Sequence, residues 1–201
     1  MSTAVQLCNL ALSRVGQDPV LESLETPATV EEQLCSQFYP MVRDYVLTSF
    51  DWTFSRVKDH LALLANEKPH PPFKFIYQCP TDCARVISIF NEQDPRPQKY
   101  SLEAARFGGR FICTNIPDAW IEYQLYGENV TVLPPNVEDA LVWLLAAELA
   151  GSLLKSSTGV QLSVRFREMG EQLLQKSAGR DISQSREFKQ DFHSEFELAR
   201  L

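Results

Sequence analysis

Two cysteines separated by three residues are the nearest thing in this chain to a metal-binding motif. Cys79 and Cys83 enclose Pro80-Thr81-Asp82, which is one residue wider than the usual two-residue gap, and no second cysteine pair follows. The histidines, at positions 60, 70 and 193, form no ligand cluster in the sequence. A cysteine nucleophile with a histidine partner has no motif to support it. We therefore expect no metal and no cofactor.

Glycine and carboxylate pairs are the other patterns that could serve chemistry. Gly108-Gly109 lacks the Gly-Lys-Ser/Thr ending of a phosphate loop and lies between strand-like residues. Glu31-Glu32 and Glu138-Asp139 lie where helices are expected to begin, so capping and helix-dipole roles explain them. A glycosidase would need two carboxyl groups that face a cleft from separate elements. The sequence alone does not exclude such a pair.

Composition and charge restrict the class of protein. The chain has 201 residues, of which 44% are hydrophobic, as in a folded domain with a core. Its net charge of -7 disfavours binding to nucleic-acid phosphates, although a protein that surrounds DNA without holding it is compatible with that charge. Ser2–Ala11 does not resemble a secretory signal, and the apolar run Ala140–Ala147 is too short to span a membrane. The odd count of five scattered cysteines favours reduced thiols in a cytosol.

The first third of the chain carries two helical patterns. Apolar residues at three- and four-residue steps predict a helix over Thr3–Val15, which Gly16 ends. A second helix is expected to start at Thr26 or Thr29 with Pro27 in its first turn, and to kink at Pro40. Its predicted buried face comprises Val30, Leu34, Phe38, Met41, Val42 and Tyr45. Matching stripes predict that the two helices pack on each other as an antiparallel pair.

The middle of the chain changes character. One or two further helical turns are predicted from Asp51 to about Ala65, and a proline cluster at 69–72 then marks a boundary. β-Branched and aromatic residues predict three strands, and a two-glycine turn predicts a hairpin. These segments are Phe73–Gln78, Arg85–Phe90 and Ile121–Tyr126 for the strands, and Phe107–Phe111 for the hairpin. We expect one small antiparallel sheet.

Two helices are predicted to follow. The first spans Val137–Leu154 with Asn136 as its cap, and the second spans about Val160–Ser177 and ends at Gly179. The apolar side of the second of these helices would carry Leu162, Phe166, Met169 and Leu173. The predicted fold is therefore α+β and mainly α: a four-helix bundle from residues 1–65 and 135–178, with a β insertion over 69–133. An extended C-terminal tail, 179–201, would follow this 1–178 domain.

The tail has a phenylalanine at every fourth position, namely Phe188, Phe192 and Phe196. This spacing puts the three rings on one face of a helix. Such a helix either packs on its own bundle or becomes ordered only against a partner; Gly179 and the polar run Ser183–Arg186 favour the partner. Each buried ring would contribute about 1.5–3 kcal/mol, which the cost of ordering partly offsets. We count these residues and Leu201 as the candidate partner interface.

A set of residues in the first third of the chain resembles the N-terminal pattern of podovirus tail-adaptor proteins, also called tail tubular protein A or head completion proteins. The set comprises Asn9-Leu10-Ala11-Leu12-Ser13-Arg14-Val15-Gly16, Leu21-Glu22-Ser23-Leu24, Cys35, Tyr39, Arg43-Asp44, Leu47 and Trp52-Thr53-Phe54. The likeness covers about Ala4 to Ala178; its first third is fairly specific, and the rest is a likeness of element order.

The resemblance implies a structural head-to-tail connector and no enzyme. Such subunits form a ring, usually of twelve, beneath the portal protein, and they provide a platform for the tail nozzle protein. DNA passes through the lumen without specific binding, the ring helps to retain it, and the C-terminal segment reaches the portal. The implied location is the head–tail junction of the virion, and the host cytoplasm during assembly, with no membrane. The alternative is a virion-associated peptidoglycan hydrolase; a small DNA-binding adaptor is disfavoured by the acidic charge.

Several residues of the helical part are expected to pack within the bundle or between ring subunits. These are Leu12, Leu34, Phe38, Tyr45, Trp52 and Trp143. Arg43 and Asp44 are either a solvated pair or a salt bridge that fixes orientation within or between subunits. Such a bridge is worth roughly 1 kcal/mol or less if it is exposed.

Overall fold

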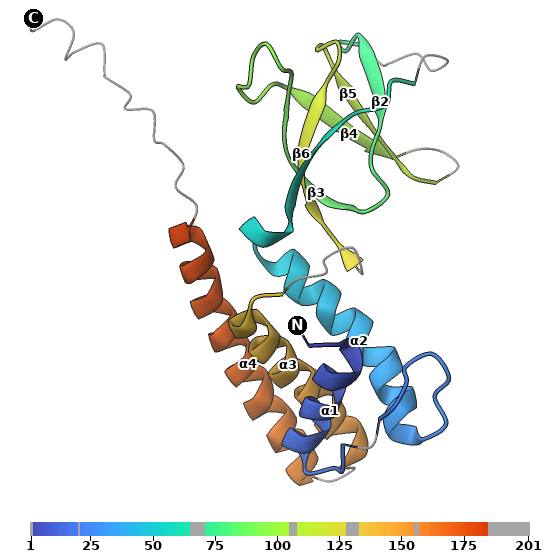
Figure 1. Ribbon diagram of the computed structural model, residues 1–201, viewed down its shortest axis with the longest axis vertical. Helices are drawn as coiled ribbons and strands as arrows, with labels where there is room; N and C mark the ends of the chain where they lie inside the picture. Colours follow the sequence, from blue (N-terminus) through green and yellow to red (C-terminus); the bar gives the residue numbers. More distant parts are fainter. Residues whose placement is uncertain are drawn as a thin grey trace, which may run out of the picture.

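The computed structural model describes residues 2–19, 21–64, 71–104, 108–127, 133–154 and 157–184. Within these residues, four α-helices gather at one end of the molecule and six strands at the other (Figure 1). Two helices precede the strands and two follow them, which confirms the α+β class and the insertion between the second and third helices. The described helices include none with the length and apolar character to cross a membrane.

Helix α1 spans Ala4–Val15, as predicted. Thr3 caps it: the Thr3 hydroxyl accepts a hydrogen bond from the Gln6 amide, and the Gln6 side chain accepts one from the Thr3 amide. Gly16 ends it in the left-handed conformation, with φ of 84°, where a residue without a Cβ has no steric penalty. The predicted end of this helix is therefore confirmed.

Helix α2 spans Val30–Ser49 and runs through Pro40 as one element. Thr29 is its cap and forms a capping box with Glu32, so Pro27 precedes the helix and its predicted place in the first turn is wrong. The predicted buried face is also wrong in part, since Val30, Met41 and Tyr45 are exposed by 61%, 63% and 47%. The observed buried face is rotated about the helix axis by about a quarter to a third of a turn from the predicted one. It comprises Cys35, Val42, Val46 and Leu47.

Helix α3, Pro135–Leu153, explains this rotation because it is the centre of the bundle. It buries ten residues around its circumference, and α1, α2 and α4 each pack mainly against it, whereas α1 and α2 have little direct contact. The expectation that the first two helices pack chiefly on each other is therefore wrong. Pro134 is the residue before the helix and makes no side-chain cap, so the predicted cap at Asn136 is also wrong.

Helix α4 spans Ser157–Gln184 and continues past Gly179, where the sequence predicted its end. It packs closely on α3 through Gly170: a Cβ added there would lie 2.7 Å from Leu144 Cγ. Gly179 has no neighbouring atom within 4 Å of such a Cβ, so it is a surface glycine inside a helix. Helices α3 and α4 thus approach more closely than larger residues would allow.

The strands form two three-stranded antiparallel sheets, where the sequence predicted one. The first has the order β1-β6-β3 and the second β2-β5-β4. The bounds are β1 Arg56–His60, β2 Phe75–Gln78, β3 Cys83–Phe90, β4 Tyr100–Ala104, β5 Arg110–Thr114 and β6 Trp120–Leu125. The turn before β5 contains Gly108 and Gly109 with φ of 99° and 89°, as the hairpin prediction required.

The helical turns predicted from Asp51 to Ala65 are wrong. A single 3-10 turn, Thr53–Ser55, leads directly into β1, which pairs with β6 along its whole length. Each end of the molecule has its own apolar core. One is built from the helices and includes Trp52, and the other from the strands around Ile89, Ile112 and Ile121.

Candidate functional site

The segment that joins the helices to the sheets is anchored by Trp52. Its side chain is fully buried in the helical core, and its Nε1 donates a hydrogen bond to the Val46 carbonyl oxygen at 2.8 Å. The rings of Phe50 and Phe54 both pack on it, with centroids 5.4 Å from the Trp52 ring in both cases. A buried tryptophan whose N–H has a partner fixes the direction in which the chain leaves α2.

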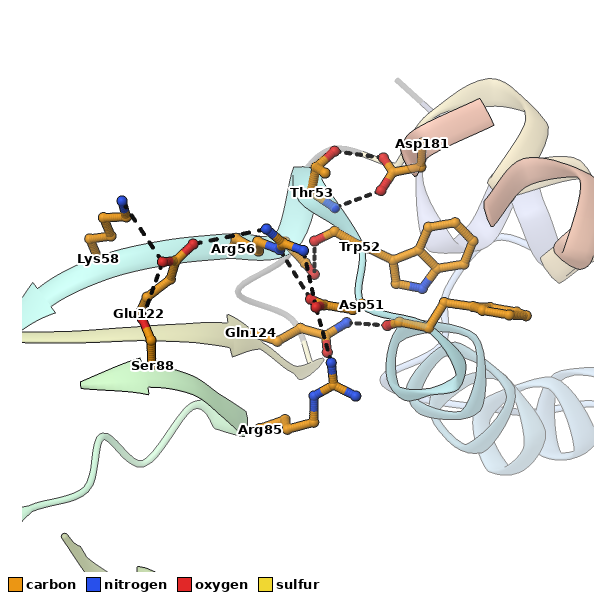
Figure 2. Close-up of polar contacts among 12 residues, drawn as sticks. Asp51, Trp52, Thr53, Arg56, Lys58, Arg85, Ser88, Glu122, Gln124 and Asp181 are labelled. Atoms are coloured by element: carbon orange, nitrogen blue, oxygen red, sulfur yellow. Dashed lines mark hydrogen bonds and ion pairs between the residues drawn. The ribbon is translucent and has the colours of Figure 1, made fainter. Parts of the chain in front are cut away.

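Asp181, in the last described turn of α4, accepts hydrogen bonds from the 3-10 turn that follows Trp52. One carboxylate oxygen accepts a hydrogen bond from the Thr53 amide at 2.7 Å, and the other accepts from Thr53 Oγ1 at 2.7 Å (Figure 2). Asp181 is only 9% exposed, so these bonds are shielded from competing water. The end of α4 is thereby attached to the start of the β region.

A network of ion pairs connects the same segment to the first sheet. Asp51 accepts two hydrogen bonds from Arg56, both at 3.0 Å, and lies 3.1 Å from the guanidinium of Arg85 on β3. Arg56 is also 4.0 Å from Glu122 on β6, and Lys58 Nζ is 3.8 Å from the same carboxylate. The residues lie together between the two ends of the molecule (Figure 2). Each pair alone contributes little, but a network with bidentate geometry restrains orientation.

The contacts of Asp51, Trp52, Thr53, Arg56, Gln124 and Asp181 form the junction between the helices and the sheets. Gln124 of β6 supplies its most buried polar contact. It is 1% exposed, and its Nε2 donates to the carbonyl oxygens of Leu47 and Phe50 at 2.6 and 2.7 Å. These carbonyls belong to the C-terminal end of α2, where no further helical turn supplies a donor. A strand side chain therefore caps a helix, and the two cores are joined by polar contacts.

A groove runs between α2 and α4, and Leu144 and Glu148 of α3 line its mainly apolar first part. Helices α2 and α4 have little direct contact, which leaves a hollow of about 220 Å³ between them. A second hollow of about 270 Å³, with a more polar lining, continues towards the sheets and shares Tyr45. The first is lined by Phe38, Met41, Val42, Tyr45, Leu144, Glu148 and Arg167, and the second by Tyr45, Ser49, Phe50, Glu171, Leu174 and Gln175. Glu148 and Arg167 form an ion pair in the first hollow.

A second exposed surface lies on α1, which packs on a different side of α3. Leu10 is 51% exposed beside a hollow of about 470 Å³ that Gln6, Asn9, Ser13 and Pro19 also line. Asn9 fixes the link after α1, because its side chain donates to the Leu21 carbonyl at 2.9 Å and accepts from the Leu21 amide at 3.0 Å.

Arg14, a residue of the sequence pattern, ties α1 to α3. The Arg14 guanidinium forms an ion pair with Asp139 and lies 4.0 Å over the ring of Trp143. Trp143 in turn packs on Phe166 of α4, with ring centroids 5.2 Å apart. Arg14 therefore acts both through its charge and through its stacked plane.

The other packing candidates are divided between the core and the groove. Leu12 is fully buried, Leu34 is half-buried against the helical core, and Phe38 and Tyr45 line the groove. Arg43 Nε lies 3.1 Å from Asp44 Oδ1, so the pair forms a salt bridge within this chain. The partner-interface candidates Phe188, Phe192, Phe196 and Leu201 lie outside the described residues.

The cysteines form two buried pairs. The thiol of Cys83 is hydrogen-bonded to Cys79, which lowers the pKa of Cys79 to about 7, and Arg110 acts in the same direction; the pKa of Cys83 is raised. Cys8 and Cys35 are paired in the same way across α1 and α2, with the pKa of Cys8 raised and that of Cys35 lowered. All five thiols are free and buried. Within the described part of the chain, no three His, Cys, Asp or Glu residues are placed to bind a metal ion.

Sequence reasoning missed the polar residues of the junction. Asp181 was placed in a tail beyond the helix because Gly179 resembles a helix end, and Gln124 and Arg56 lie in segments with no recognisable motif. One sequence signal for Gln124 is available. Side chains alternate between the two faces of a strand, so over Trp120–Leu125 Gln124 lies on the same face as Glu122. No protein-family model matches the chain, and the search of curated proteins finds no significant match.

Proposed function

We propose that this chain is a structural subunit of a bacteriophage head-to-tail connector, a tail adaptor that forms a ring beneath the portal. In this role it extends the DNA channel, helps to retain packaged DNA and offers a platform to the tail nozzle. The proposal rests on the resemblance of Asn9–Gly16 and Trp52–Phe54 to that family. The contacts of Arg14, Asn9 and Trp52 give that pattern a physical role, because they fix α1, its following link and the exit from α2.

The observation that favours a ring subunit is the presence of two different hollowed surfaces on one bundle, each with exposed large hydrophobic side chains: Met41 and Tyr45 on one and Leu10 on the other. Met41 and Tyr45 border the α2–α4 groove above Leu144 of α3, while Leu10 lies on α1, which packs on the side of α3 that carries Asp139. A ring requires two unlike surfaces on each subunit, since every contact is head-to-tail.

The negative net charge of the chain is compatible with a ring through which DNA passes without being bound. A net charge of -7 gives a surface that repels phosphate overall, so a ring of such subunits would not hold DNA by counterion release. The protein's role would be mechanical, and no catalytic residue is assigned.

The test measures the mass of the full chain by light scattering, alone and after mixing with portal rings from the same phage or prophage. We expect rings, seen by negative-stain imaging, on the portal, and loss of ring formation in a Met41→Lys/Tyr45→Lys variant. Leu102→Lys, on the 40% exposed Leu102 of β4, is the matched control and should assemble normally. A protein that stays monomeric and ignores portals contradicts the proposal, as does clearing of a peptidoglycan suspension, which would identify a hydrolase.

A further inference from the structure

The turn between β2 and β3 holds two thiols in contact. Cys79 directly follows β2, Cys83 begins β3, and the thiol of Cys83 is hydrogen-bonded to the sulfur of Cys79. Both residues are 2% exposed and belong to the apolar core of the strands. Because β2 and β3 lie in different sheets, this contact of two sulfur atoms spans the passage of the chain from one sheet to the other.

Backbone hydrogen bonds hold the two cysteines in these places. The Cys79 amide donates to the Arg110 carbonyl oxygen at 3.0 Å, which extends the pairing of β2 with β5 by one residue. The Cys83 amide donates to the Pro80 carbonyl oxygen at 3.2 Å and closes the turn. The Arg110 guanidinium donates to the Cys83 carbonyl oxygen. One residue of β5 therefore binds the backbone of both cysteines.

Asp82, between the two cysteines, is attached to the other sheet. Its carboxylate accepts a hydrogen bond from the Tyr123 hydroxyl at 3.2 Å, and its carbonyl oxygen accepts one from the Tyr126 amide at 3.1 Å. A turn that is held at both ends and in the middle gives the two thiols little freedom to separate. A second thiol held beside the first reacts as if its concentration were very high, because no entropy is lost in bringing it there.

The surrounding groups favour a thiolate at one of the two positions. The hydrogen bond from Cys83 lowers the pKa of Cys79 to about 7, and the charge of Arg110 acts in the same direction against burial and the Asp82 carboxylate. The pKa of Cys83 is raised, chiefly by the same hydrogen bond. Burial and Asp82 raise the pKa of Tyr123, so its hydroxyl stays protonated. Cys79 is therefore partly ionised at neutral pH, and the thiolate is the form that reacts.

The second pair of thiols in the chain has a different setting. Cys8 on α1 and Cys35 on α2 are also hydrogen-bonded, but both are completely buried in the helical core. The charge that acts on Cys35 is the carboxylate of Glu31, which disfavours a thiolate. Thr81, by contrast, is exposed in the turn that covers the first pair. The first pair thus lies directly beneath the surface beside a guanidinium, and the second does not.

From this arrangement we propose that Cys79 and Cys83 are a redox pair, which closes to a disulfide when a small peroxide reaches the turn. The Cys79 thiolate attacks one peroxide oxygen, so that an S–O bond forms, the O–O bond breaks and the hydroxide that leaves takes up a proton. The Cys83 sulfur then attacks the Cys79 sulfur: the S–S bond forms, the S–O bond breaks, and the second hydroxide takes the Cys83 proton. Two electrons pass from the sulfurs to the peroxide, which becomes two molecules of water, and a thiol reductant reverses the change.

The disulfide would be a covalent link between the two sheets. It would enclose only Pro80, Thr81 and Asp82, so it should add less to the free energy of unfolding than a disulfide that closes a long loop. Its direct effect is to fix the end of β2 to the start of β3. The inference goes beyond the proposed connector role and does not depend on it.

Oxidation of the full, folded chain by hydrogen peroxide at pH 7 tests the proposal. The intact mass should fall by the mass of two hydrogen atoms, and peptide mapping should place the disulfide between Cys79 and Cys83. This should occur while Cys8 and Cys35 are still thiols, so the second pair is a control within the same molecule. Treatment with dithiothreitol should restore the original mass.

Substitutions separate the two steps. In Cys83→Ser the reaction should stop at a sulfenic acid on Cys79, which dimedone traps. In Arg110→Met the rate of oxidation at pH 7 should fall several-fold, and its rise with pH should move above the value of about 7 expected for the unmodified chain. Arg96→Met, on an exposed loop, is the matched control and should leave the rate and its pH profile unchanged.

The order of reaction decides the matter. A disulfide between Cys8 and Cys35, or oxidation of Cys113, that precedes the loss of the Cys79 and Cys83 thiols would overturn the proposal. Oxidation of Cys79 and Cys83 only after urea has unfolded the chain would overturn it as well, because the pair would then be a buried contact that peroxide does not reach. An unchanged rate and pH profile in Arg110→Met would remove the assigned role of the guanidinium and contradict the mechanism.

Discussion

Asp181 and Thr53 are 128 residues apart, yet both carboxylate oxygens of Asp181 accept hydrogen bonds from Thr53, each at 2.7 Å. This contact joins the end of the last helix to the turn from which the sheets begin. With Gln124 and Asp51 it forms the polar link between two otherwise separate apolar cores. The relative placement of helices and sheets therefore depends on a few polar side chains.

Replacing Asp181 should weaken this link measurably. Asp181→Ala leaves the Thr53 amide and hydroxyl without their acceptors in a buried place, so we expect a loss of about 1–3 kcal/mol in the free energy of unfolding. Asp181→Asn keeps one carbonyl acceptor and should lose less. Urea denaturation followed by circular dichroism measures both, with Glu168→Ala on the exposed side of α4 as the control. Equal stability of Asp181→Ala and Glu168→Ala would contradict the assigned role.

Two substitutions of Gln124 test whether its side chain stabilises the fold as a hydrogen-bond donor. Gln124→Leu removes the donor to the Leu47 and Phe50 carbonyls and should cost about 1–3 kcal/mol of unfolding free energy. Gln124→Glu should cost more, because an ionised carboxylate only accepts and would face two carbonyl oxygens. The measurement is again urea denaturation at neutral pH. If the glutamate variant is as stable as the wild type, the carbonyl cap is not what stabilises this position.

The parts of the fold that sequence predicted are those with local causes. Gly16 ends α1 because of its own conformational freedom, and Gly108-Gly109 turns the chain for the same reason. The strands β3 and β6 were predicted from β-branched and aromatic residues within one segment. These features need no knowledge of distant residues.

The wrong predictions concern features that are determined by residues distant in the sequence. The buried face of α2 is set by α3, about a hundred residues later, so a stripe that includes Met41 was assigned to the core although it lines a groove. Gly179 has the residue type of a helix end, but the helix continues and places Asp181 against Thr53. The strand β1 exists because β6 pairs with it, and the residues of β1 alone do not indicate that partner.

Gly170 and Gly179 form a matched pair on one helix. Gly170→Ala would put a Cβ 2.7 Å from Leu144 Cγ and 3.1 Å from the Leu144 amide nitrogen, so we expect a loss of about 1–3 kcal/mol from strained α3–α4 packing. Gly179→Ala meets no atom within 4 Å and should gain about 0.5–1 kcal/mol, as in any exposed helix interior. Thermal unfolding of both variants decides the matter. A destabilising Gly179→Ala would mean that α4 ends near Gly179.

The capping box of α2 predicts a pH dependence. Hydrogen bonds from the amides of Ala28 and Thr29 lower the pKa of Glu32 below its usual value of about 4.5. A carboxyl whose pKa is lower in the folded state stabilises that state above the usual pKa, and the contribution is lost as the pH falls through the lowered pKa. The midpoint of thermal unfolding should therefore exceed that of Glu32→Gln at pH 7, and the difference should shrink as the pH falls through the lowered pKa of Glu32. Glu31→Gln, which leaves the box intact, is the control; an identical pH profile for both variants would contradict the prediction.

The end of α4 decides where the chain can be shortened. A chain that ends at Gln184 keeps Asp181 and its two bonds to Thr53, and we expect it to unfold cooperatively. A chain that ends at Ala178 loses Asp181 together with the last turns of α4, so its unfolding free energy should fall at least as far as that of Asp181→Ala. Under the proposed function, the form that ends at Gln184 should also fail to bind portal rings, because it lacks Phe188, Phe192 and Phe196. Light scattering of each form with portal rings measures this. Full binding by the form that ends at Gln184 would show that these phenylalanines do not contact the portal, while its folding would still support the Asp181 contact.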